Sequence, residues 1–152
     1  MKKLLHFIFL TTLLPLIGWA KIQVVKIYHL PWSIATSTAM TAEGVRKNAM
    51  FKMEITDDGY AERFVRSLAA EKMSEGDHQP VSDLRLVIDV TSDDGSIITF
   101  VASRFELGGQ KSGKKRTIDD AFRARFSSLY EEKADTIRAA NPTEVWLKST
   151  FG

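Results

Sequence analysis

Apolar and polar positions follow two different periods along this chain. Residues 22–30 form an apolar run rich in β-branched side chains, and residues 48–55 alternate between apolar and charged side chains, so both segments are predicted to be strands. Apolar residues then recur every three or four positions after Thr56-Asp57-Asp58, a sequence typical of helix starts, which predicts a helix over residues 58–73.

A second helical pattern begins near residue 117. Thr117 and Asp120 resemble a capping box with Asp in place of Glu, and Asn141-Pro142 ends the predicted helix and starts a short final one. The apolar side chains that mark this second helix are Ile118, Phe122, Phe126, Leu129, Tyr130 and Ile137.

Between the two helices lies a predicted β-hairpin, residues 84–105, with Asp94-Gly95 as a two-residue turn. This turn places Ile88 opposite Val101, and side chains alternate between the two faces of the hairpin. The residues predicted to face the core are Leu84, Leu86, Ile88, Val90, Ile97, Val101 and Phe105.

The order of elements is therefore β-β-α-β-β-α. We expect an α+β fold of two layers, with a four-stranded, mainly antiparallel sheet and the helices packed on one face. Residues 21–152 are long enough for a single domain with a proper core. The second sheet face is expected to be open or partly covered, and binding is expected there.

Two arginines fall on this second face. The predicted turn places Arg85 opposite Arg104, and Asp83 opposite Glu106, so that the four charges form either a solvated cluster or a receptor for an acidic group of a partner. Phe100 makes the same face partly apolar. We therefore treat Arg85, Arg104 and Phe100 as candidate partner-binding residues.

The segment after the hairpin is rich in glycine and lysine. Residues 108–116 are predicted to form a flexible, solvated loop, because their order does not match a phosphate-binding loop and the acidic residues 119–120 occupy the following helix start. The positive charge suits contact with an acidic protein or, peripherally, an anionic membrane surface. The candidate contact residues are Lys111, Lys114, Lys115 and Arg116.

The first 20 residues read as a signal peptide. Lys2 and Lys3 precede an apolar run, and Gly18-Trp19-Ala20 resembles a cleavage site, so cleavage is expected near Ala20. The absence of cysteine favours a periplasmic location or secretion without disulfides. Without Lys2 and Lys3, 19 of the 21 Lys and Arg residues remain against 19 Asp and Glu, so the mature chain is nearly neutral and its charge gives no support for nucleic-acid binding.

The motifs of common catalytic and metal sites are missing. The chain has no cysteine and no G-x-S-x-G elbow, and neither His29 nor His78 has a second ligand at metal-binding spacing. We predict no catalytic residues, no metal and no cofactor. Tyr28, His29 and Trp32 are candidates for the lining of a pocket, although aromatic residues at strand ends more often pack in the core.

These patterns favour a small exported, non-catalytic protein-binding domain, such as an inhibitor, an immunity protein or an accessory protein. Its partner would be another periplasmic protein or one delivered there. The alternative is a small-molecule carrier or enzyme with a pocket between the sheet and the helices.

Overall fold

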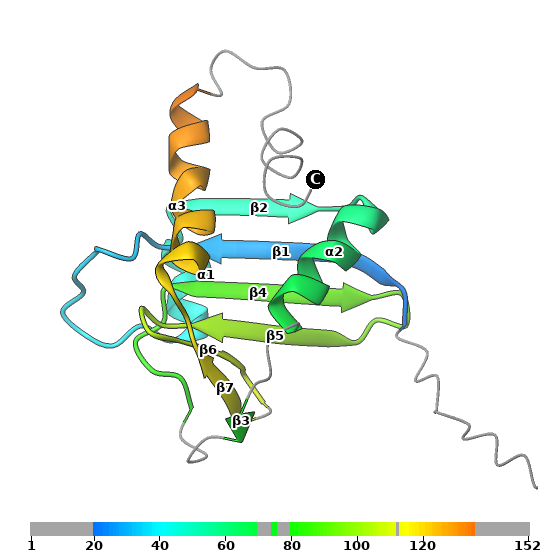
Figure 1. The fold of residues 1–152 in the computed structure, drawn as a ribbon, viewed down its shortest axis with the longest axis horizontal. Helices are drawn as coiled ribbons and strands as arrows, with labels where there is room; N and C mark the ends of the chain where they lie inside the picture. Colours follow the sequence, from blue (N-terminus) through cyan, green and yellow to red (C-terminus); the bar gives the residue numbers. More distant parts are fainter. Residues whose placement is uncertain (1–19, 70–73, 76–79, 112, 136–152) are drawn as a thin grey trace, which may run out of the picture.

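The computed structural model describes residues 20–69, 74–75, 80–111 and 113–135. The fold is α+β, as predicted, and these residues form three helices and an open antiparallel sheet (Figure 1). In chain order the elements are β1 (Ile22–His29), α1 (Ala42–Asn48), β2 (Phe51–Ile55), α2 (Asp58–Ala69), β3 (Ser74–Glu75), β4 (Leu86–Ser92), β5 (Ile97–Ala102), β6 (Glu106–Gly109), β7 (Lys114–Thr117) and α3 (Asp120–Asp135).

The sheet is larger than predicted. Its strand order is β2-β1-β4-β5-β6-β7-β3, with six strands of four or more residues and the two-residue β3 at one edge. The additional strands β6 and β7 come from the segment predicted to be a flexible loop. A Cβ atom at Gly108 would lie 2.9 Å from the Lys114 carbonyl oxygen, so glycine serves here to let two strands approach closely rather than to loosen the chain.

The hairpin of β4 and β5 is paired one residue away from the predicted register. Ile88 lies opposite Phe100, not Val101, because the loop has three residues, Asp93-Asp94-Gly95. The Ser92 N–H donates to the Ser96 carbonyl at 2.9 Å and Gly95 has φ of 80°, the arrangement of a turn followed by a left-handed residue. A shift of one residue moves every β5 side chain to the other face.

The charged cross-strand pairs expected from the two-residue turn are therefore wrong. Strand β5 ends at Ala102, so Arg104 has no position opposite Arg85 in this hairpin. Glu106 pairs with Thr117 in the next hairpin instead of lying opposite Asp83.

Helices cover both faces of the sheet, not one. Helices α2 and α3 lie in front of it in Figure 1 and α1 lies behind. The α2 and α3 side chains pack with the inward residues of β1 and β4 into the main core, and α1 packs on the second face with a smaller cluster. That smaller cluster consists of Leu30, Ala42, Val45, Leu84, Val87 and Val101.

Local capping explains where the helices begin. The Thr41 hydroxyl accepts a hydrogen bond from the Gly44 N–H at 3.1 Å and starts α1, a helix that the sequence patterns missed. Helix α2 begins at the predicted Thr56-Asp57-Asp58 sequence, where Asp57 accepts a hydrogen bond from the Tyr60 N–H at 3.0 Å. The residue that caps α3 is Asp119, which accepts from the Phe122 N–H at 2.7 Å, and not the predicted Thr117.

Some predictions concern residues outside the described ranges. These are the signal peptide up to residue 19, His78, and the chain beyond residue 135 with its predicted final helix. Among the described residues, no helix has the length and apolar character needed to cross a membrane.

Candidate functional site

Arg85 is buried, contrary to the expectation that its side chain projects from the open face. Its side chain is 1% exposed. One terminal nitrogen, Nη1, donates to Asp83 Oδ1 at 2.7 Å and to the Leu84 carbonyl at 2.9 Å. The other, Nη2, donates to Asp83 Oδ2 at 3.1 Å, to the Ile34 carbonyl at 3.3 Å and to Thr36 Oγ1 at 3.4 Å. Arg85 thus fastens the segment after β1 to the start of β4.

Asp83 stands beside Arg85 in an unusual backbone conformation. Its φ is 53°, in the left-handed region that few residues other than glycine adopt. Its carboxylate compensates by accepting from Arg85 and from the Met40 N–H at 3.3 Å, while the Leu84 N–H donates to the Met40 carbonyl at 2.9 Å. The hydrogen bond from Arg85 lowers the pKa of Asp83, with a smaller contribution from the Met40 N–H, so the carboxyl group is charged near neutral pH.

Arg104 is half-buried and reaches the same segment from the other side. Its Nη2 donates to the Ile34 carbonyl at 2.6 Å, and its own carbonyl accepts from Arg123 Nη1 at 2.8 Å. The two arginines predicted to form one cluster therefore do converge, on the carbonyl of Ile34, although not by facing each other across a hairpin.

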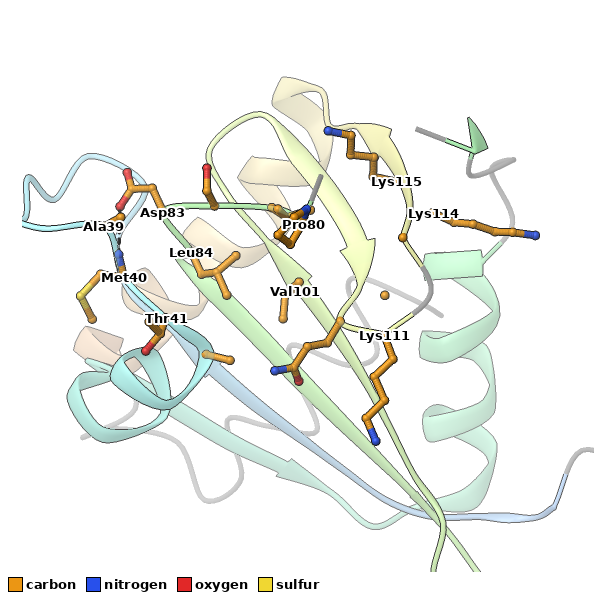
Figure 2. A pocket seen from close by; sticks show the side chains of 16 residues that line it. Ala39, Met40, Thr41, Pro80, Asp83, Leu84, Val101, Lys111, Lys114 and Lys115 are labelled. Carbon is orange, nitrogen blue, oxygen red and sulfur yellow. Dashed lines mark hydrogen bonds between the residues drawn. The ribbon is translucent and has the colours of Figure 1, made fainter. Parts of the chain in front are cut away.

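A cleft of about 660 Å³ opens on the second face of the sheet. Leu84 and Val101 form its floor, and Met40 and Val81, both half-buried, form its apolar sides. Figure 2 shows Leu84 and Val101 between the segment of Ala39 to Thr41 on one side and a group of lysines on the other. The apolar floor exists because the register of β5 places Val101 on this face.

The loop and second strand of the β6–β7 hairpin supply the basic side of this cleft. Lys111 and Lys114 are exposed, and Lys115 is half-buried with its amine 3.2 Å from Glu106 Oε1. All three were candidate contact residues. Sequence reasoning identified these lysines but placed them in a loop, whereas Lys114 and Lys115 belong to β7. Of these two, Lys115 shares the face of Gly108 and Val81, and Lys114 alternates to the other face.

A second hollow of about 510 Å³ adjoins the cleft. Ser82 and Asp83 line both. The second hollow is also bordered by Arg104 and by Phe105, whose residue surface is 68% exposed. Phe105 was predicted to be in the core, and this prediction is wrong because Phe105 lies in the turn between β5 and β6.

The two other candidate contact residues lie on the first face of the sheet. Phe100 is half-buried and packs against the main core. The guanidinium of Arg116 lies 5.3 Å from the centre of the Phe122 ring, beside α3. The structure does not bring either residue together with the lysines of the cleft.

The three candidate pocket residues do not line a common space. His29 is completely buried in the main core, with its ring 4.6 Å from Trp32 and 5.9 Å from Phe126, and burial lowers the pKa of His29 to about 3. Trp32 donates from Nε1 to the Arg123 carbonyl at 3.0 Å. Tyr28 packs against the smaller cluster on the opposite face, because neighbouring residues of β1 point in opposite directions.

The sequence patterns did not predict one polar network on the second face. The Arg46 guanidinium binds Asp89 through two hydrogen bonds of 2.8 Å, and Thr99 Oγ1 donates to Asp89 at 2.7 Å. These hydrogen bonds, from Arg46 and then Thr99, outweigh burial and lower the pKa of Asp89. The network attaches α1 to the sheet next to the cleft, and no local pattern in the sequence announces it.

Within the described part of the chain, no group of three or more His, Asp or Glu side chains is arranged to hold a metal ion. No protein-family model, no curated protein and no solved structure matches this chain.

Proposed function

We propose that this protein is an exported, non-catalytic binding domain that holds another protein in the cleft between α1 and the β6–β7 hairpin. The observation that carries the proposal is the combination of an apolar floor, Leu84 and Val101, with lysines along one side. An apolar centre surrounded by polar groups is the usual composition of a protein-binding surface. An inhibitor, an immunity protein or an accessory subunit would all use such a surface.

The chemistry of the lining supports binding over catalysis. Among the described residues that line the two hollows there is no histidine, the commonest general base beside a nucleophilic hydroxyl. The one carboxylate common to both hollows, Asp83, is held in its charged form by Arg85. A charged carboxylate in ion-pair contact is a weak proton acceptor.

A carrier with a pocket between the sheet and the helices is less well supported. Aromatic rings of α2 and α3 fill that space, with ring centres 5.1 Å apart for Phe122 and Phe126 and 6.3 Å apart for Phe64 and Phe126. Rings at these distances leave little room for a ligand.

Export is the second part of the proposal and has its own test. If residues 1–20 are a signal peptide, the mature protein recovered outside the cytoplasm begins near Lys21. Mass spectrometry of the protein from fractionated cells measures its first residue. Intact Met1 in the recovered protein would contradict cleavage.

Site-specific photo-crosslinking in the source organism tests the binding role. A photoreactive residue at Gln110, which lines the cleft, is expected to capture one partner in stoichiometric amount. The matched control is the same residue at Lys52, which is exposed on β2, four places away from β6 in the strand order. Equal capture from both positions, or none from Gln110, would refute binding in the cleft.

A further inference from the structure

Strand β2 forms one edge of the sheet, and β1 is its only neighbour among the described strands (Figure 1). The outer main-chain N–H and C=O groups of an edge strand can pair with a further strand. Proteins often prevent this pairing with a charged side chain, usually lysine, and Lys52 is exposed on β2. A lysine alone would protect this edge, but exposed Glu54 follows two residues later on the same face.

The charges near this edge alternate in sign across the second face of the sheet. Lys26 of β1 lies opposite Asp89 of β4 on one side and opposite Glu54 of β2 on the other. The Lys26 amine is 3.7 Å from Glu54 Oε2, and both side chains are about half exposed. Lys52 lies opposite Tyr28 instead, and it has no ion pair with any residue that the structure describes. The edge therefore presents an acidic side chain and a basic one that can still accept a partner.

The order of charges along β2 is complementary to itself in an antiparallel pair. When two copies of β2 align about a two-fold axis at Met53, Lys52 of each copy lies opposite Glu54 of the other, and Phe51 lies opposite Ile55. An axis at Lys52 or at Glu54 would place two like charges opposite each other. A shift of one residue would bring the exposed row of one strand beside the core-facing row of the other. The alignment at Met53 satisfies both charge and face.

We propose that a second copy of this chain pairs with β2 along the sheet edge, in the antiparallel alignment centred on Met53. The two sheets then form one continuous sheet with two Lys52–Glu54 ion pairs on its second face. The net charge of +2 is too small to oppose this association strongly. The inference goes beyond the proposed function and does not depend on it. Val101 of the cleft floor is in β5, three places from β2 in the strand order, so both clefts stay open on the same side of the joined sheet.

Sedimentation equilibrium of the purified protein measures this association. The five residues of β2 give a small interface, so we expect a dimer that dissociates on dilution, with a dissociation constant between about 10 µM and about 1 mM. A monomer at every concentration up to about 1 mM would overturn the inference. Pairing of β2 with another segment of its own chain would give that result.

Charge reversal at the two exposed positions tests the alignment. K52E and E54K each place like charges in both cross-strand pairs, so each variant alone is expected to dimerise at least about tenfold more weakly. An equal mixture of the two variants restores an acid opposite a base in both pairs. The mixture is therefore expected to form a mixed dimer with an affinity within about threefold of that of the unchanged protein.

The matched controls are R66E and E62K, which make the same changes of charge at exposed positions on α2. Both controls are expected to dimerise like the unchanged protein. Circular dichroism checks that all four variants are folded, which is expected because each substituted side chain is exposed. Equal weakening by the controls, full dimerisation of K52E or E54K alone, or failure of their mixture to dimerise would each overturn the inference.

Introduced cysteines measure the same alignment directly, because the chain has no cysteine of its own. Directly opposite residues have Cα atoms about 4.5–5.5 Å apart, which a disulfide can bridge, whereas identical positions would lie on a diagonal of about 7–8 Å. A mixture of K52C and E54C is therefore expected to form more disulfide-linked dimer than either variant alone. Equal yields from the mixture and the single variants would contradict the alignment. A photoreactive residue at Lys52 is likewise expected to capture a second copy of this chain, whose mass distinguishes it from a partner captured at Gln110.

Discussion

Arg85 provides the sharpest test of the structure, because the sequence pattern and the structure predict different stabilities for the same substitution. Arg85→Met keeps the length of the side chain and removes the guanidinium. On the solvated face expected from the sequence, such a change costs about 0–1 kcal/mol. In the structure it removes hydrogen bonds to Asp83, Leu84, Ile34 and Thr36.

The magnitude follows from the groups left behind. Removing one partner of a buried ion pair costs about 3–5 kcal/mol, because the other charge stays without compensation. Here Asp83 is 42% exposed at its side chain, so water replaces part of the lost interaction. We therefore expect Arg85→Met to lower the free energy of unfolding by about 2–3 kcal/mol.

Urea unfolding followed by circular dichroism measures this difference, provided that the slope of the free energy of unfolding against urea concentration is the same for both proteins. Arg66→Met is the matched control, because Arg66 is 82% exposed at its side chain and its ion pair with Glu62 lies on the surface of α2. The control is expected to change stability by at most about 0.5 kcal/mol. A loss of less than about 1 kcal/mol for Arg85→Met, similar to the control, would refute the burial of this guanidinium.

Three further predictions concern single residues. Because burial lowers the pKa of His29 to about 3 in the folded protein, the stability that neutral His29 contributes is complete above about pH 6.5 and is lost as the pH falls, by up to about 1.4 kcal/mol per pH unit. Urea unfolding between pH 7 and 5 should therefore show a smaller pH dependence of stability for His29→Gln than for the unchanged protein. Identical pH dependences would contradict this prediction. Gly95→Ala should lower the stability measured by thermal unfolding by about 1 kcal/mol, because φ at Gly95 is 80°. Gly59→Ala in α2 should instead raise stability by about 0.5 kcal/mol, because a Cβ atom there meets only ordinary contacts of 3.4 Å and more. Effects of the same sign would contradict the two backbone conformations. Gly108→Ala should disturb the β6–β7 hairpin, since its Cβ atom would lie 2.9 Å from a backbone oxygen, and hydrogen exchange of the β6 and β7 amides should become faster; unchanged exchange would contradict the close approach.

The sequence patterns predicted elements better than they predicted how those elements pair. Strands β1, β2, β4 and β5 and helices α2 and α3 follow the apolar periods of the chain. Asp94-Gly95 is compatible with loops of two or three residues, and only the second agrees with the observed pairing of Ile88 with Phe100. The one additional residue in the loop moves every side chain of β5 to the opposite face of the sheet. No local sequence pattern shows the length of this loop.

The candidate site was predicted in part for a similar reason. Arg104 and the three lysines border the two hollows, but the opposite wall comes from residues 39–42 and 80–84, which no periodic pattern connects with the hairpin. Arg85 was placed outside because alternation along the strand puts it on the second sheet face, which was expected to be open or partly covered. Its partners are the Asp83 carboxylate, the Thr36 hydroxyl and the carbonyl groups of Leu84 and Ile34. Every residue carries a carbonyl group, so a sequence does not distinguish these last two partners.

The hydrogen bonds from two guanidinium groups to the Ile34 carbonyl have a consequence for the rate at which a partner associates. The connection between β1 and α1, which includes Met40, is already held in place in the free protein, so binding requires little loss of chain entropy on that side of the cleft. Such a rigid binding surface is expected to associate rapidly with charged partners and to discriminate among partners mainly through their dissociation rates.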